Sequence, residues 1–233
     1  MKFNDIIEIT KLMYEKGWAE RNAGNFSIRL TATEKNMLEN DFQNVEELCI
    51  DNRQNILRHD INLLISVSGS RFRTIHTNLI NNIGILSINF SKQKAMWYHN
   101  GHIPTSEWMS HLRIHNKFLD INSTNKCIIH THPTELIAFS HKLNDKNEDY
   151  INTVLANMMP EVSLFIPKGI GLVSDFAMGS EDLAKASEEK IVNYDILLWQ
   201  KHGCLATGKN FWELFESIEL VNKAAKIYLL CGF

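Results

Sequence analysis

Two histidines separated by a single residue are the most distinctive chemical feature of the chain. They lie in Cys127-Ile128-Ile129-His130-Thr131-His132-Pro133, where an apolar run leads in and a proline follows. If residues 126–131 form a strand, successive side chains point to opposite faces, so His130 and His132 project to the same side. Two imidazoles in that arrangement can bind one metal ion and leave space for a third ligand and an open coordination position.

A third histidine, His202, follows another apolar segment, residues 196–200, which we expect to be a strand. Strand ends are where sites are assembled in open sheets, and three neutral imidazoles with a vacant position are typical of a catalytic rather than a structural zinc site. The spacing alone is also compatible with three histidines that share no metal ion. We expect several of the other histidines, which lack such a pattern, to face solvent. The histidines without the pattern are His59, His76, His99, His102, His111, His115 and His141.

A carboxylate stands at the start of an expected helix. The segment Pro104-Thr105-Ser106-Glu107 opens this helix, with Thr105 or Ser106 as its cap. Glu107 then lies in the first turn, where the helix dipole favours a negative charge. Stabilisation of the helix start is therefore a sufficient structural reason for a glutamate at position 107, unless the residues around Glu107 give it another role. Thr105 and Ser106 at a helix start also form a ready anion site.

Two loops that contain glycine could bind an anion. Residues 22–25 form a tight loop before an expected strand at 26–30, and Asn and Gly can turn backbone amides inward to make a concave anion site. A plain turn is the alternative. After an expected buried strand at 63–67, Ser68-Gly69-Ser70 would expose hydroxyl and N–H groups together, which suits a phosphate. A hairpin turn needs the same residues.

Composition narrows the class of protein. The chain has 233 residues, which suits one domain, and its hydrophobic fraction of 44% and charged fraction of 22% are ordinary for a globular protein. A net charge of -3 without a basic stripe argues against nucleic acid as a partner. No stretch approaches the roughly 18 apolar residues of a membrane helix, and the polar N-terminus argues against export, so we expect a cytoplasmic protein. The cysteines are scattered and indicate neither a disulfide framework nor a sulfur-bound zinc: Cys49, Cys127, Cys204 and Cys231.

The hydrophobic pattern predicts helices and strands in mixed order. Helices are expected at 3–14, 41–48, from 105 or 106 to about 118, 134–141, 150–159, 181–193 and 211–230. Strands are expected at 26–30, 63–67, 83–90, 95–98, 126–131, 163–166 and 196–200. Many short strands with interspersed helices favour an α/β or α+β fold in one layered domain.

Five short segments share their order and approximate spacing with a known family. They are Glu20-Arg21-Asn22-Ala23-Gly24-Asn25, Ser68-Gly69, Pro104-Thr105-Ser106-Glu107, His130-Thr131-His132-Pro133 and Lys201-His202-Gly203. Together they resemble the class II aldolase and adducin family over roughly residues 5–231, and most of all the bacterial rhamnulose-1-phosphate aldolases and related sugar-phosphate aldolases. The resemblance implies an α/β fold, a single three-layer domain (1–233) whose central, mostly antiparallel sheet is flanked by helices.

The resemblance also implies roles. His130, His132 and His202 would bind one Zn²⁺ per subunit, and Glu107 would be the catalytic acid/base. Glu161 matches an acidic position that reaches the neighbouring subunit's active site in rhamnulose-1-phosphate aldolases, and the family is typically homotetrameric. The substrate phosphate would be held by Asn22, Asn25, Ser68, Gly69, Thr105 and Ser106.

The implied reaction is the reversible cleavage of a ketose 1-phosphate, L-rhamnulose 1-phosphate, to dihydroxyacetone phosphate and L-lactaldehyde. A pentulose-5-phosphate 4-epimerase of the same family is an alternative, because it would use the same metal and a similar retro-aldol step. A non-catalytic adducin-like scaffold is a second alternative, but such domains have lost metal ligands that this sequence keeps. Ala23 stands where the rhamnulose enzymes usually have Gly, and Ser70 stands where they commonly have Lys. These departures concern the identity of the sugar and not the metal chemistry.

Overall fold

Nine strands and the helices around them make up the computed structural model, which describes residues 3–50, 56–144 and 146–232. The strands are β1 (Asn25–Leu30), β2 (Asn44–Glu47), β3 (Ile61–Ser66), β4 (Ile83–Asn89), β5 (Lys94–His99), β6 (Cys127–Thr131), β7 (Ile170–Val173), β8 (Ile196–Trp199) and β9 (Gly203–Gly208). The α-helices are α1 (Phe3–Glu15), α2 (Ala32–Leu38), α4 (Trp108–Asp120), α5 (Thr134–His141), α6 (Glu148–Met158), α7 (Glu161–Phe165), α8 (Glu181–Lys190) and α9 (Phe211–Leu230).

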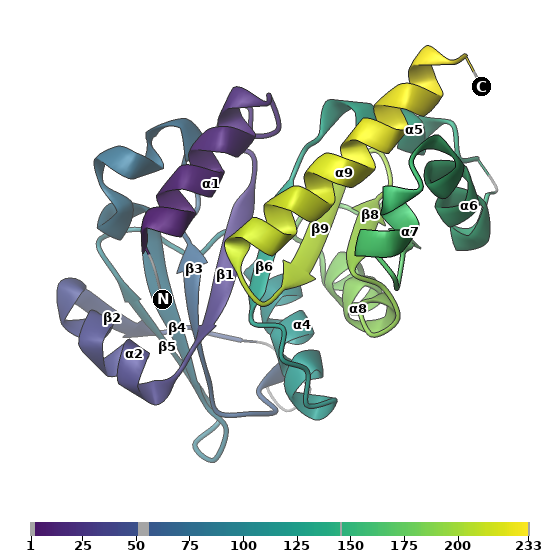
Figure 1. The fold of residues 1–233 in the computed structure, drawn as a ribbon. Coiled ribbons are helices and arrows are strands. Elements are labelled where there is room, and N and C mark those ends of the chain that lie inside the picture. Colours follow the sequence, from purple (N-terminus) through teal and green to yellow (C-terminus); the bar gives the residue numbers. More distant parts are fainter. Residues whose placement is uncertain (1–2, 51–55, 145, 233) are drawn as a thin grey trace.

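All nine strands belong to one sheet with helices on both faces (Figure 1). The order is β2-β5-β4-β3-β1-β6-β9-β8-β7, and all neighbours are antiparallel except β7 and β8. The predicted α/β fold with a mostly antiparallel central sheet is therefore confirmed.

Side chains of the central strands point alternately into two helical layers. In β3, Leu64 packs into the cluster that contains α1 and α9, whereas Leu63 and Ile65 pack into a second cluster with α4. In β6, Ile129 lies on the α9 side and Ile128 on the side of α4 and α8. Strands buried on both faces carry nearly continuous apolar runs, which explains why these segments lack polar alternation.

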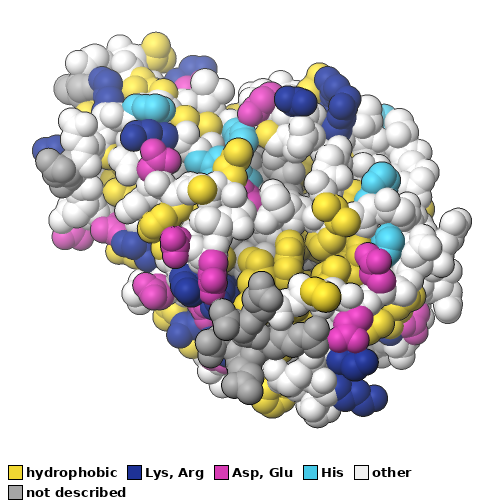
Figure 2. Space-filling view, turned by 180° about the vertical axis from the view of Figure 1, so that it is seen from behind, with side chains coloured by type: hydrophobic (Ala, Val, Ile, Leu, Met, Phe, Trp, Pro, Cys, Tyr) yellow, Lys and Arg dark blue, Asp and Glu magenta, His cyan; other side chains and the backbone are white. Residues whose placement is uncertain are grey.

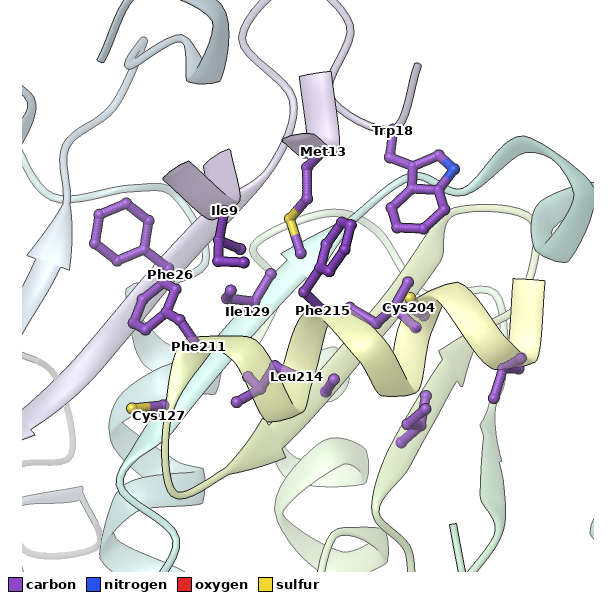
Figure 3. Packing of buried hydrophobic residues seen from close by; sticks show 14 of the residues in the cluster. Ile9, Met13, Trp18, Phe26, Cys127, Ile129, Cys204, Phe211, Leu214 and Phe215 are labelled. Atoms are coloured by element: carbon purple, nitrogen blue, oxygen red, sulfur yellow. The ribbon is translucent and has the colours of Figure 1, made fainter. Parts of the chain in front are cut away.

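The first layer packs α1 and α9 against the middle of the sheet. Figure 3 shows Ile9 and Met13 of α1, Phe211 and Phe215 of α9 and Ile129 of β6, which all belong to one buried cluster. The apolar positions of both helices recur at helical spacing, so each helix buries one face on the sheet.

The second layer consists of α4 and α8. Arg113 of α4 binds Glu188 at 3.0 Å and Glu181 at 3.2 Å, and both glutamates belong to α8. Ile114 and Phe118 pack with Leu183 beneath these ion pairs. This packing fixes α4 on the sheet, with its N-terminal end beside the ends of β1 and β6.

The predicted helix at 41–48 is wrong. The structure has α2 before this segment and the edge strand β2 within it. Thr31 and Glu34 form a capping box that starts α2. All residues of β2 are exposed, so no apolar alternation marks the strand, and its pairing with β5 determines its conformation.

The predicted strand at 163–166 is also wrong. Helix α7 begins directly after Pro160, and the next strand is β7. A short apolar run does not distinguish a strand from a buried helix turn. The pattern does not predict β9 either, because its conformation depends on pairing with β6 and β8 on its two sides.

Two further features concern the apolar length of the helices and the charged side chains on the surface. None of the described helices is both long and apolar enough to span a bilayer. Figure 2 shows the side opposite to the view of Figure 1, where basic and acidic side chains are interspersed and histidines are visible close together in the upper part.

Candidate active site

A cleft lies where the ends of β1, β6 and β9 meet the start of α4. The strand register places Asn25 of β1 opposite His130 of β6, and Thr131 opposite Cys204 of β9. The cleft has a volume of about 390 Å³, which is within the range of small-molecule sites. It is lined by residues 20–25, 67–69 and 105–107, and by His130, His132, Met178 and His202.

Three imidazoles converge in this cleft. His130, His132 and His202 each offer a ring nitrogen, and these atoms lie within 4.8 Å of one another. The Nε2 atoms of His130 and His132 are 3.2 Å apart. A tetrahedral zinc ion with Zn–N bonds of about 2.1 Å holds its nitrogen ligands about 3.4 Å apart. The spacing therefore fits one shared metal ion.

Hydrogen bonds on the outer side of two rings determine which nitrogen faces the centre. His130 Nδ1 lies 2.9 Å from the carbonyl oxygen of Cys204, and His132 Nδ1 lies 2.8 Å from Glu20 Oε1. Both partners accept hydrogen bonds, so each Nδ1 carries the proton and each Nε2 presents a lone pair. Two lone pairs at 3.2 Å repel each other unless a cation lies between them. This donor set suits a metal ion.

Burial keeps two of these rings neutral. Burial, together with the nearby rings of His132 and His202, holds the pKa of His130 well below its usual value. Burial also lowers the pKa of His202 to about 4. Because the neutral imidazole is the form that binds metal, both rings are in the ligand form at neutral pH.

The position of His202 depends on the residues on both sides of it. Lys201 has a φ of 61°, in the left-handed region that few non-glycine residues adopt. A Cβ on Gly203 would lie 2.5 Å from the Thr131 carbonyl oxygen and 2.9 Å from the His132 ring. Only glycine therefore lets β9 start so close to β6, which brings His202 to the other two histidines.

Glu107 faces the histidines across the cleft. Its Oε2 is 3.7 Å from His130 Nε2, its Oε1 is 3.7 Å from His202 Nε2, and Asn25 Nδ2 donates to Oε2 at 3.1 Å. The residue is only 3% exposed. Burial raises the pKa of Glu107 to about 7, against the opposing effect of the Asn25 hydrogen bond. A carboxyl group with this pKa can give and take protons near neutral pH.

The expectation that Thr105 or Ser106 caps the helix is wrong. Glu107 itself occupies the N-cap position of α4, and its side chain makes no capping hydrogen bond. The N–H of Trp108 donates to the carbonyl of Thr105, so Thr105 and Ser106 form a turn before the helix. The carboxylate is thus directed into the cleft instead of toward the helix N–H groups.

The other part of the cleft is an exposed rim. Asn22, Ser68, Gly69 and Ser106 are exposed there, and the N–H groups of Gly69 and Ser106 have no hydrogen-bond acceptor in the described part of the chain. A Cβ on Gly69 would meet open space, but its φ of 79° favours glycine. Free N–H groups beside hydroxyls suit an anionic ligand.

Every site residue predicted from the sequence lines this cleft except Glu161. Glu161 is exposed at the start of α7 and is not among the residues that line the cleft of its own chain. Glu20, Arg21 and Met178 also line it, although the sequence pattern indicates no role for them. Glu20 begins the first motif, and only the fold shows that it binds His132.

Two of the seven histidines without a ligand pattern do not face solvent. His111 and His115 are fully buried between α4 and β1. Their positions four and eight residues after Glu107 place all three on one face of the helix. That spacing was the available signal.

Comparison with known proteins agrees with this geometry. The family model described as "Class II Aldolase and Adducin N-terminal domain" matches residues 4–229. A rhamnulose-1-phosphate aldolase from Listeria welshimeri is 32% identical over 97% of this chain and 81% of its own length. A rhamnulose-1-phosphate aldolase from Bacteroides thetaiotaomicron is 29% identical over 97% of this chain and 84% of its own length.

A solved structure shows the same fold at similar identity. The crystal structure of a sugar-phosphate aldolase from Thermotoga maritima superposes with a TM-score of 0.81 at 31% identity, covering 99% of this chain and 97% of that one. The family model, these relatives and the converging histidines agree. The chain belongs to the class II aldolase and adducin family.

Proposed function

We propose that this protein is a zinc-dependent aldolase that reversibly cleaves L-rhamnulose 1-phosphate to dihydroxyacetone phosphate and L-lactaldehyde in the cytoplasm. The observation that carries this proposal is the meeting of three metal-competent imidazoles with a buried carboxyl group of raised pKa in one cleft. The rhamnulose-1-phosphate aldolases among its relatives support the choice of sugar.

The metal would be held by His130, His132 and His202. Three neutral nitrogen donors with an open position are characteristic of catalytic zinc. When bound, such a cation supplies Lewis acidity that stabilises the negative charge developing on the ketose oxygens as the C3–C4 bond breaks. Glu20 holds the ring of His132 through Nδ1 and so keeps its Nε2 directed at the centre.

Glu107 would transfer the proton at the donor carbon. In the cleavage direction the C4 hydroxyl releases its proton to solvent and C4 becomes the aldehyde carbonyl, while the C3–C4 electrons pass into an enediolate. Protonated Glu107 then delivers its proton to C3 to give dihydroxyacetone phosphate and is protonated again from solvent. In the synthetic direction the carboxylate removes the same proton. A pKa of about 7 leaves both forms populated at neutral pH, which a reversible reaction requires.

The phosphate would bind at the exposed rim. Ser68, Gly69 and Ser106 line this part of the cleft, and the two hydroxyls and the N–H of Gly69 would donate to a phosphate oxygen. The exposed Asn22 and the buried Thr105 also line the cleft. Holding the phosphate at the rim orients the reacting carbons toward the buried groups, so part of the entropic cost of the reaction is met on binding.

We place Glu161 in the active site of a neighbouring subunit within a homotetramer. Its own chain keeps it outside the cleft, and two large apolar side chains beside it in α7 are exposed, Leu164 at 71% and Phe165 at 67%. Such exposure is typical of a surface that contacts another chain. Sedimentation should give a tetramer, and a mixture of E161Q and E107Q subunits should regain activity in hybrid tetramers if Glu161 acts across the interface.

A substrate panel tests the reaction. The zinc-loaded protein is incubated with ketose 1-phosphates, L-rhamnulose 1-phosphate among them, and with pentulose 5-phosphates. Release of dihydroxyacetone phosphate supports the aldolase, and its fastest release from L-rhamnulose 1-phosphate supports the sugar. Inversion at C4 without cleavage would identify an epimerase instead, and no reaction with any substrate would favour a scaffold.

A further inference from the structure

A row of buried polar side chains extends inward from Glu107. Asn25 Nδ2 donates to Glu107 Oε2 at 3.1 Å, and Asn25 Oδ1 lies 2.6 Å from His111 Nε2. Ser27 Oγ lies 2.8 Å from both His111 Nδ1 and His115 Nε2. Glu107 and Asn25 are 3% and 7% exposed, and the other three residues are fully buried. None of the three residues beyond Asn25 lines the cleft.

The row forms because a helix and a strand run side by side with nearly equal repeats. Glu107, His111 and His115 are spaced four residues apart on α4, a rise of about 6.0 Å per step. Asn25 and Ser27 are two residues apart on one face of β1, a rise of about 6.6 Å. Each strand side chain therefore falls between two helix side chains, and the hydrogen bonds alternate between the two elements.

The hydrogen bonds of the row have a single direction. Because Asn25 Nδ2–H donates to the Glu107 carboxylate, Asn25 Oδ1 must accept from His111 Nε2–H. His111 Nδ1 then accepts from the Ser27 hydroxyl, and Ser27 Oγ accepts from His115 Nε2–H. Both rings must be neutral for this pattern, and burial lowers the pKa of His111 to about 3 and that of His115 well below its usual value. Every donor points toward Glu107.

The row also occupies both ends of the Asn25 amide. Its oxygen is bound by His111 and its nitrogen by Glu107. The exposed Asn22, three residues earlier in the same loop, has no such partners in the described part of the chain. The two asparagines of the first motif are thus in different environments, one beside the proton-transfer group and one at the rim.

We propose that Asn25 is a positioning residue for the Glu107 carboxylate instead of a phosphate ligand, and that His111, Ser27 and His115 hold its amide in that orientation. This inference rests on the proposed aldolase function, because it assigns Glu107 the proton transfer. The row sets the direction in which the carboxylate presents its oxygens to C3. Apolar side chains at the same positions would fill the space but would leave the Asn25 amide free to turn over.

The first experiment separates positioning from phosphate binding. The zinc-loaded protein is incubated with dihydroxyacetone phosphate in D2O, and exchange of the C3 proton, which needs no aldehyde, is followed by NMR. The N25A variant should lower the saturated exchange rate on the order of 10- to 100-fold, as misplacement of a catalytic group does. Its Kd for dihydroxyacetone phosphate and its zinc content should stay near those of the wild type. A raised Kd with an unchanged saturated rate would make Asn25 a phosphate ligand and overturn the proposal.

Variants deeper in the row test whether it acts through Asn25. S27A should lower the exchange rate less than N25A, since the amide keeps its His111 contact. The matched control is S110A, which removes a hydroxyl that is 1% exposed on the same helix and has no hydrogen-bond partner among the described residues. H111Q keeps an N–H near the position of Nε2 and should retain more of the rate than H111L. Equal losses in S27A and S110A, or in H111Q and H111L, would reduce the row to a packing role.

A readout without catalysis distinguishes failure of this inference from failure of the proposed function. In protein labelled with 15N-histidine, His111 and His115 should both appear at pH 7 as neutral Nε2–H tautomers, and N25A should shift the His111 signals. An Nδ1–H tautomer or a charged ring at either position would contradict the hydrogen-bond pattern of the row and overturn the proposal. If the wild type exchanges no proton while the tautomers are as stated, the aldolase assignment fails and the row stands as a structural feature.

Discussion

The two parts of the cleft differ in burial and in what holds them. Glu107 and His130 are 3% and 1% exposed, and their positions follow from the packing of α4 and β6. Ser68, Gly69 and Ser106 are exposed and belong to loops. The buried part offers titratable groups and metal ligands, whereas the rim offers hydroxyls and backbone N–H groups.

The difference matches the roles that we propose for the two parts. Proton transfer needs a carboxyl group whose pKa is raised by burial, and metal binding needs rings that stay neutral. A phosphate already carries its charge and needs only donors that it can reach from solvent. Changes in the buried part should therefore act on kcat or on the metal, and changes at the rim on KM.

Removal of the metal should abolish turnover. A chelator with high zinc affinity should reduce the cleavage of ketose 1-phosphate to background, because the developing negative charge loses its main stabilisation. Zn²⁺ added back should restore the rate, and H202A, which lacks one ligand, should not recover at the same zinc concentration. Full activity in metal-free protein, verified by elemental analysis, would contradict the assignment of the three histidines.

The Glu107→Gln variant should lose most of its turnover while keeping both ligands. A general acid/base contributes on the order of 10²- to 10⁴-fold, so kcat should fall by about that factor. Zinc content and the Kd for dihydroxyacetone phosphate should stay near the wild-type values, as measured by elemental analysis and calorimetry. Full activity in this variant would remove Glu107 from the mechanism.

The Glu20→Gln variant should weaken the metal site moderately. Glu20 orients His132 through a 2.8 Å contact, and loss of such a partner costs on the order of 10- to 100-fold in metal affinity. Competition with a chromophoric chelator measures the zinc Kd. Glu15→Gln, an exposed carboxylate on α1, is the control and should bind zinc as the wild type does.

At the rim, Ser68→Ala should raise KM and leave kcat nearly unchanged. A hydrogen bond to a charged group contributes about 1.5 kcal/mol or more, which corresponds to roughly a 10-fold rise in KM. Ser70→Ala is a matched control, because Ser70 is buried and does not line the cleft. A fall in kcat at constant KM for Ser68→Ala would contradict the division between the two parts.

The smallest effect concerns the stability of the metal-free protein. The pKa of Glu107 rises from 4.5 to about 7 on folding, so the folded state holds this proton more tightly than the unfolded chain. Its contribution to the free energy of unfolding is therefore full below about pH 4.5 and declines as the pH rises to 7. Urea titrations in chelator should show the wild type losing stability relative to E107Q over that interval. A constant difference would show that the pKa is not raised.

Much of the site could be predicted because its residues stand in short sequence motifs. Strand alternation predicts that His130 and His132 share one face, and the helix-start pattern predicts that Glu107 lies at the start of a helix. The strand β2 and the helix α7 were not predicted, because exposed edge strands and short apolar segments carry weak periodic signals. The spacing of His111 and His115 after Glu107 indicates a shared helix face, but nothing local to α4 shows that β1 covers that face.

The family, the ligand types and the alternation that places two histidines on one side of a strand follow from the sequence alone. How these residues meet depends on the tertiary structure. The sheet brings β1, β6 and β9 side by side although they are far apart in the chain, and α4 buries Glu107 against them. Local sequence sets a residue's chemistry and spacing, whereas burial and long-range contacts set its pKa and its partners. That is why Asn25 could be read as part of a phosphate loop and yet lies between Glu107 and His111.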